Sequence, residues 1–123
     1  MRLKLIVAAI AVGMPVAASA QSMNAENFFQ KAAALQRKGM MAMFSSDVKL
    51  LMKEAKIAGE TARAQRLATQ KSGGKPRYCP PPGSQRLGSD EFIQRLGAIP
   101  RVDRLKINML EAMIRILAVK FPC

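Results

Sequence analysis

The spacing of apolar residues predicts helices along most of the chain. These residues recur every three or four positions, as they do on a helix that is packed on one side. A first helix is predicted from Asn24, a good N-cap residue, to Lys38, and a long second helix from Ser45 or Ser46 to about Lys71. Alternating Val, Ile and Thr runs and Asn-Gly or Asp-Gly turns are absent, so strands are not expected.

Glycine and proline interrupt this helical pattern in residues 73–88. The stretch holds Gly73, Gly74 and Pro76, followed by three successive prolines and Gly83. Neither a helix nor a sheet can run through such a segment, because proline has no backbone amide hydrogen to donate and glycine is too flexible to favour either structure. We expect an extended and stiff loop here.

Two further helices are expected after the loop. A short third helix is capped by Ser89 and ends at Gly97, and a final helix runs from about Asp103 to Lys120. The final helix is the most hydrophobic and is expected to form the centre of the core. Its predicted buried stripe consists of Leu110, Met113, Ile114, Leu117 and Phe121, widened by Leu105, Met109 and Ile116.

The predicted fold is a small all-α bundle of about four helices in one domain, residues 21–123. A helical pair in 21–72 is joined through the loop in 73–88 to a second helical pair in 89–123. About a hundred residues form only a modest core, so a covalent link would add useful stability.

The first 20 residues have the character of an export signal. Arg2 and Lys4 precede an apolar stretch over 5–16, and the Ala-Ser-Ala tripeptide at 18–20 fits the small-x-small cleavage rule. The apolar stretch is shorter than the ~20 residues that span a bilayer, which favours cleavage over a membrane anchor. We therefore expect 1–20 to be a cleaved signal peptide and the protein to be periplasmic or secreted.

The chain contains two cysteines, Cys79 and Cys123. An even number of cysteines in a small exported protein favours a disulfide, because the periplasm and the exterior keep such pairs oxidised. This bond would fasten Cys123 to the Pro-rich loop. By closing a loop of roughly 45 residues it would contribute about 4 kcal/mol to stability in the chain-entropy model.

The residue inventory argues against an enzyme. The chain has no histidine, which removes the usual general base and every histidine-based zinc site. No catalytic residue, metal site or cofactor is predicted. Met40, Met41 and Met43, with Met52, could offer thioethers to Cu(I), but methionines more often fill core gaps or form a contact surface.

The strong positive charge limits the class of partner. The formal net charge is +12, and removal of the signal leaves about +10. Nucleic acid is not expected for an exported protein without aromatic stacking positions. Anionic lipid headgroups, lipopolysaccharide or an acidic protein fit better, and a solvated face that only keeps the domain soluble is the alternative. The cations crowd the first half of the mature chain: Lys31, Arg37, Lys38, Lys49, Lys53, Lys56, Arg63, Arg66, Lys71, Lys75 and Arg77.

Two motifs carry a family resemblance. Cys79, Pro81 and Gly83 form a Cys-x-Pro-x-Gly element, and the chain ends in Phe-Pro-Cys at 121–123, with Pro100 in the turn between them. In this arrangement the C-terminal part resembles the Tai-type (also called Rap-type) immunity proteins of bacterial type VI secretion. The N-terminal half instead resembles small uncharacterised secreted bacterial proteins, on the segment Met-Phe-Ser-Ser-Asp at 43–47.

The resemblance implies an all-helical periplasmic protein that occludes the active site of a peptidoglycan amidase, as a homodimer. On that hypothesis the loop would contact this cell-wall hydrolase through Lys75, Arg77 and Arg86, whose charge would steer it toward an acidic cleft. The alternative function is a basic, envelope-associated helical protein that binds anionic lipid or glycan and has no toxin partner.

Overall fold

The computed structural model describes residues 22–83 and 86–123, and it confirms a small all-α fold with a Cys79–Cys123 disulfide. The signal expected in 1–20 lies outside the described residues. The elements are α1 (Ala25–Lys38), the 3-10 helix η2 (Gly39–Phe44), α2 (Ser46–Lys71), α3 (Ser89–Ala98), α4 (Arg101–Arg104) and α5 (Met109–Lys120). No helix in the described ranges is both long and apolar enough to cross a membrane.

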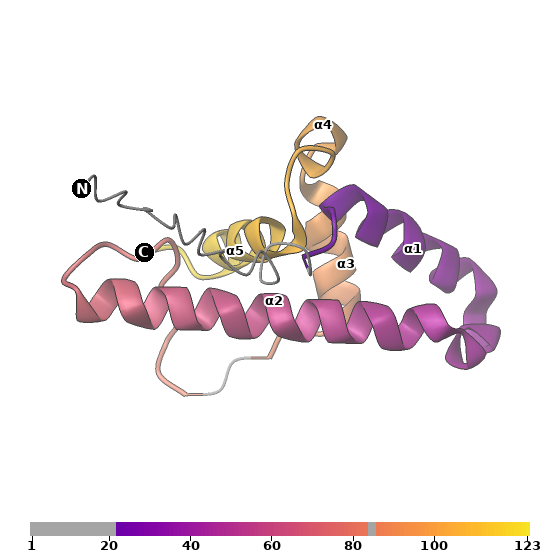
Figure 1. Ribbon diagram of the computed structural model, residues 1–123, viewed down its shortest axis with the longest axis horizontal. Helices are drawn as coiled ribbons and strands as arrows, with labels where there is room; N and C mark the ends of the chain where they lie inside the picture. The colour runs from indigo at the N-terminus through magenta and orange to yellow at the C-terminus, as the bar shows by residue number, and fades with distance from the viewer. Residues whose placement is uncertain (1–21, 84–85) are drawn as a thin grey trace, which may run out of the picture.

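The first two helices begin and end where their capping residues predict. The Asn24 side chain accepts hydrogen bonds from the amides of Glu26 and Asn27, and Gly39 ends α1 with a φ of +58°. Ser45 caps α2 by accepting a hydrogen bond from the Asp47 amide. The two helices form a hairpin whose connection, η2, lies at one end of the molecule, and α2 runs along its whole length (Figure 1).

The prediction of one continuous final helix is wrong. The chain forms the single turn α4, leaves the helical path, and starts α5 after Asn108, whose side chain accepts a hydrogen bond from the Glu111 amide at 2.9 Å. The backbone at this break forms hydrogen bonds with a distant segment of the chain. The Ala25 amide donates to the Ile107 carbonyl, and the Met109 amide donates to the Met23 carbonyl. Backbone groups that a helix would use internally therefore bind the segment that leads into α1.

The third helix also starts differently from the prediction. Ser89 is its first residue, and Gly88 occupies the N-cap position without a side-chain hydrogen bond. Asp90 and Glu91 still lie in the first turn, where negative charge complements the helix dipole.

The core lies between α1, α2, α3 and α5. Leu96, Met109 and Ile116 are its largest fully buried side chains, and Ala58 and Ala62 let α5 approach α2 closely. The predicted buried stripe of α5 is confirmed in part. Met109, Met113, Ile114 and Ile116 are buried as expected, but Leu110, Leu117 and Phe121 are only partly buried and Leu105 is exposed.

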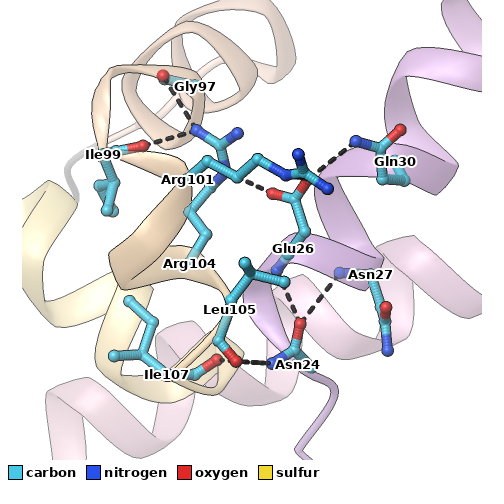
Figure 2. A network of polar contacts seen from close by, with 10 residues as sticks. All are labelled: Asn24, Glu26, Asn27, Gln30, Gly97, Ile99, Arg101, Arg104, Leu105 and Ile107. Atoms are coloured by element: carbon cyan, nitrogen blue, oxygen red, sulfur yellow. Dashed lines mark hydrogen bonds and ion pairs between the residues drawn. The ribbon is translucent and has the colours of Figure 1, made fainter.

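A buried ion pair joins α1 to α4 (Figure 2). Arg104 Nε donates to Glu26 Oε2 at 2.7 Å, and the same guanidinium donates to the carbonyls of Gly97 and Ile99. Gln30 donates to the other oxygen of Glu26 at 2.8 Å. These hydrogen bonds, the one from Gln30 first and then the one from Arg104, lower the pKa of Glu26. Both charges of the pair therefore have hydrogen-bonded partners, and the pair links the first turn of α1 to α4.

Candidate functional site

A groove of about 970 Å³ lies between α2 and the Pro-rich loop. This volume is at the upper end of the usual range for small-molecule sites, roughly 300–1,000 Å³. Figure 1 shows residues 72–83, which follow α2, turning back along this helix. Tyr78 and residues 80–83 of this segment line the groove opposite α2. Its lining residues are Ala55, Lys56, Gly59, Glu60, Arg63, Arg66, Tyr78, Pro80, Pro81, Pro82, Gly83, Leu87, Ser89, Phe92, Met113, Leu117 and Phe121.

The inner surface of the groove is apolar. Tyr78 from the loop, Phe92 from α3 and Met113 from α5 are all buried, so their rings and thioether are held in place by the core. Leu117 and Phe121 are partly buried and offer further apolar surface. Three separate segments of the chain thus contribute apolar side chains to the groove lining.

The wall formed by α2 is basic. Lys56, Arg63 and Arg66 all line it, and Glu60, which lies 4.0 Å from Lys56 Nζ, is the one acid among the described lining residues. The exposed Lys56–Glu60 pair contributes little to stability. The groove therefore carries positive charge directly beside an apolar surface.

Arg66 is the most unusual residue of this wall. Its guanidinium carbon lies 5.4 Å from the centre of the Tyr78 ring, close enough for a cation–π contact. Its Nε is buried, and no acceptor in the described parts of the chain forms a hydrogen bond with it. Leaving such a donor unsatisfied costs roughly 1–3 kcal/mol.

Several contacts fix the loop that forms the opposite wall. Besides the disulfide, the Cys79 amide donates to the Phe121 carbonyl at 2.8 Å. Arg77 binds Glu111 of α5 with both terminal nitrogens, which lowers the pKa of Glu111 to about 2 and raises the pKa of Arg77. Near the other end of the loop, Lys120 donates to the Arg86 carbonyl. Arg77, Cys79 and Arg86 of the loop are therefore anchored to α5 and the C-terminal residues that follow it.

The three cations predicted to contact a partner lie outside the groove lining. Lys75, Arg77 and Arg86 are all exposed, and the guanidinium of Arg77 is bound to Glu111. Arg63 and Arg66, which do line the groove, are two of many cations in the sequence and were not predicted to contact a partner. Their spacing of three on α2 was the available signal, and the loop that faces them could not be placed from the sequence.

The methionines considered for Cu(I) point to the surface. Met40, Met41, Met43 and Met52 are 84%, 69%, 78% and 69% exposed. The described residues contain no group of three or more His, Cys, Asp or Glu that could hold a metal ion.

Comparison with protein-family models, with curated proteins and with solved structures found no match.

Proposed function

We propose that this chain is a non-enzymatic binding protein of the cell envelope that holds an anionic amphiphile, such as a fatty acid, in the groove between α2 and the Pro-rich loop. The observation that carries the proposal is the position of Arg63 and Arg66 beside the apolar lining of the groove. A carboxylate bound next to them would accept charge-assisted hydrogen bonds from their guanidinium groups.

The combination of surfaces supports this class of ligand over a purely polar one. A carboxylate would lie near Arg63 and Arg66, while an alkyl chain would follow the surface made by Phe92, Met113 and Leu117. Burial of an alkyl chain contributes about 0.8 kcal/mol for each methylene group, so the apolar surface would supply much of the affinity. A free glycan would leave that surface unused.

Gly59 also supports the proposal that a ligand binds in the groove. A glycine in the middle of a long helix costs roughly 0.5–1 kcal/mol relative to alanine. A Cβ atom built at Gly59 would meet nothing within 4 Å, so no neighbouring helix requires the missing side chain. Gly59 lines the groove, and its lack of a side chain widens it.

The test is binding of palmitate, with hexadecanol as the neutral ligand of equal chain length, measured by native mass spectrometry and equilibrium dialysis. Wild type should prefer palmitate, and Arg63→Gln/Arg66→Gln should weaken palmitate binding by about tenfold or more. Gly59→Leu should weaken the binding of both ligands, because the added side chain narrows the groove. Lys71→Gln/Lys106→Gln removes two exposed cations outside the groove and should bind like wild type. Equal binding by all variants, or none by wild type, would end the proposal.

A second function, neutralisation of a peptidoglycan amidase, is favoured by the way the loop is held. Lys75 is exposed two residues before Arg77, which is fixed to Glu111, so little entropy would be lost when this segment docks. Co-expression with cell-wall amidases of the same genome would test it by rescue from lysis. Lys75→Ala/Arg86→Ala should abolish rescue and Lys71→Ala/Lys106→Ala should not. Lysis with the wild-type protein against every amidase would exclude this function.

A further inference from the structure

We infer that the hairpin of α1 and α2 docks by its tip onto a lipid bilayer that contains anionic lipids. The apolar tip, defined here as Met40, Met41, Met43 and Phe44, forms most of η2. This inference concerns the end of the molecule away from the groove and does not depend on the proposed ligand.

The apolar tip has no cover in the described structure. Its four side chains are 84%, 69%, 78% and 86% exposed, and no residue of η2 is buried. Figure 1 shows η2 beyond the ends of α1 and α2, at the end of α2 farthest from the chain's C-terminus. Single exposed apolar residues are common, but four large ones in five positions form a patch of the kind that marks an interaction site.

Cations flank the tip on both helices. Arg37 and Lys38 are the last residues of α1, and Lys49 and Lys53 lie in the first two turns of α2; all four are exposed. Asp47, the nearby acid, is 3.7 Å from Lys31 and is offset by that charge. The surroundings of the tip are therefore clearly positive.

Apolar side chains with a basic border match an anionic membrane surface. Methionine and phenylalanine would enter the boundary between headgroups and acyl chains, and the cations would remain among the phosphates. A second copy of this chain fits less well, because two tips in contact would bring Arg37, Lys38, Lys49 and Lys53 against their own copies.

Tryptophan fluorescence gives a direct test, because the chain contains no tryptophan. Phe44→Trp is tested in the protein exported by an expression host, with its N-terminus determined by mass spectrometry. Vesicles of equal parts phosphatidylcholine and phosphatidylglycerol should shift its emission to the blue, and brominated lipid should quench it. Val102→Trp replaces another exposed apolar residue (63% exposed) outside the tip and should show neither effect. An unchanged spectrum of Phe44→Trp on these vesicles would overturn the inference.

Vesicle flotation measures the energetic role of the tip. Met43→Ser/Phe44→Ser should lower binding by about tenfold or more, since two apolar side chains no longer leave water. The control Val102→Ser/Val119→Ser removes two residues of similar exposure, 63% and 74%, and should bind like wild type. Pure phosphatidylcholine vesicles should bind weakly. Binding that survives Met43→Ser/Phe44→Ser would place the membrane contact elsewhere and overturn the inference, as would concentration-dependent dimerisation through the tip without vesicle binding.

Discussion

Arg77 and Glu111 form a two-pronged ion pair, with Nη1–Oε2 and Nη2–Oε1 distances of 2.6 and 2.8 Å. They are 34 residues apart in sequence, and together they fasten the Pro-rich loop to the first turn of α5. Arg77 lies two residues before Cys79, so the disulfide and the ion pair hold the same short stretch of the loop.

This ion pair predicts loss of stability in acid. The pKa of Glu111 is lowered from 4.5 to about 2 in the folded protein, so its contribution is fully present above about pH 4.5 and disappears as the pH falls toward 2. Glu111→Gln should cost about 1–2 kcal/mol at pH 7, less than a buried pair would, because the Arg77 side chain is half exposed. Urea unfolding at pH 7 and pH 3 measures this. The difference in the free energy of unfolding between wild type and Glu111→Gln should be smaller at pH 3 than at pH 7. The exposed control Glu60→Gln should unfold with the wild-type free energy at both pH values.

The disulfide predicts a large change in thermal stability. Cys79 and Cys123 are 44 residues apart, and opening such a loop costs about 4 kcal/mol in the chain-entropy model. Cys79→Ser/Cys123→Ser, which leaves no unpaired thiol, should lower Tm by at least about 10 °C in a calorimetric scan. A Tm equal to that of wild type would show that the Arg77 contact and the Cys79 amide bond hold the loop without the disulfide.

The observed core predicts which face of α5 is sensitive. Ile116 is 2% exposed, so Ile116→Ala should cost about 2–5 kcal/mol in urea unfolding. Leu96→Ala in α3 should cost a similar amount. Leu117 is only partly buried and borders the groove, so Leu117→Ala should cost less, under about 2 kcal/mol. The reverse order would mean that Leu117, and not Ile116, faces the core.

Two glycines predict opposite effects of alanine. Gly59 is helical with open space at its Cβ position, so Gly59→Ala should raise stability by about 0.5–1 kcal/mol. Gly39 has a φ of +58° at the end of α1, and Gly39→Ala should lower stability by about 1–2 kcal/mol because a side chain disfavours that conformation. Circular dichroism during urea unfolding measures both, and the same sign for the two changes would contradict the argument.

The helices could be predicted from local signals, and the errors lie where distant segments meet. Asn24, Gly39 and Ser45 act through their nearest neighbours, so their caps could be read directly from the sequence. The break before α5 was hidden because apolar residues continue through Leu105, Ile107 and Met109. Asn108 was the available signal for a helix start, but the backbone bonds that favour the break come from Met23 and Ala25.

The groove could not be predicted from the sequence for the same reason, because distant segments build it. Arg66, Tyr78, Phe92 and Met113 come from four segments, and no spacing in the sequence indicates that they share one surface. Periodicity identifies which residues turn inward on a helix but not which loop covers them. Similarly, no local pattern indicates that Glu26 pairs with Arg104, 78 residues away, because this contact depends on the packing of α4 on α1.

The length of α2 has an electrostatic consequence. Roughly 30 Å of helix, at 1.5 Å per residue, separates Ser45 beside the tip from Arg66 in the groove. Mobile ions screen exposed charges over about 8 Å at physiological ionic strength. The electric field of a ligand bound at one end of α2 has therefore decayed before it reaches the other end. A single basic helix thus presents two electrically independent surfaces. The salt dependence of the binding constant should accordingly have a different slope for each of the two binding events.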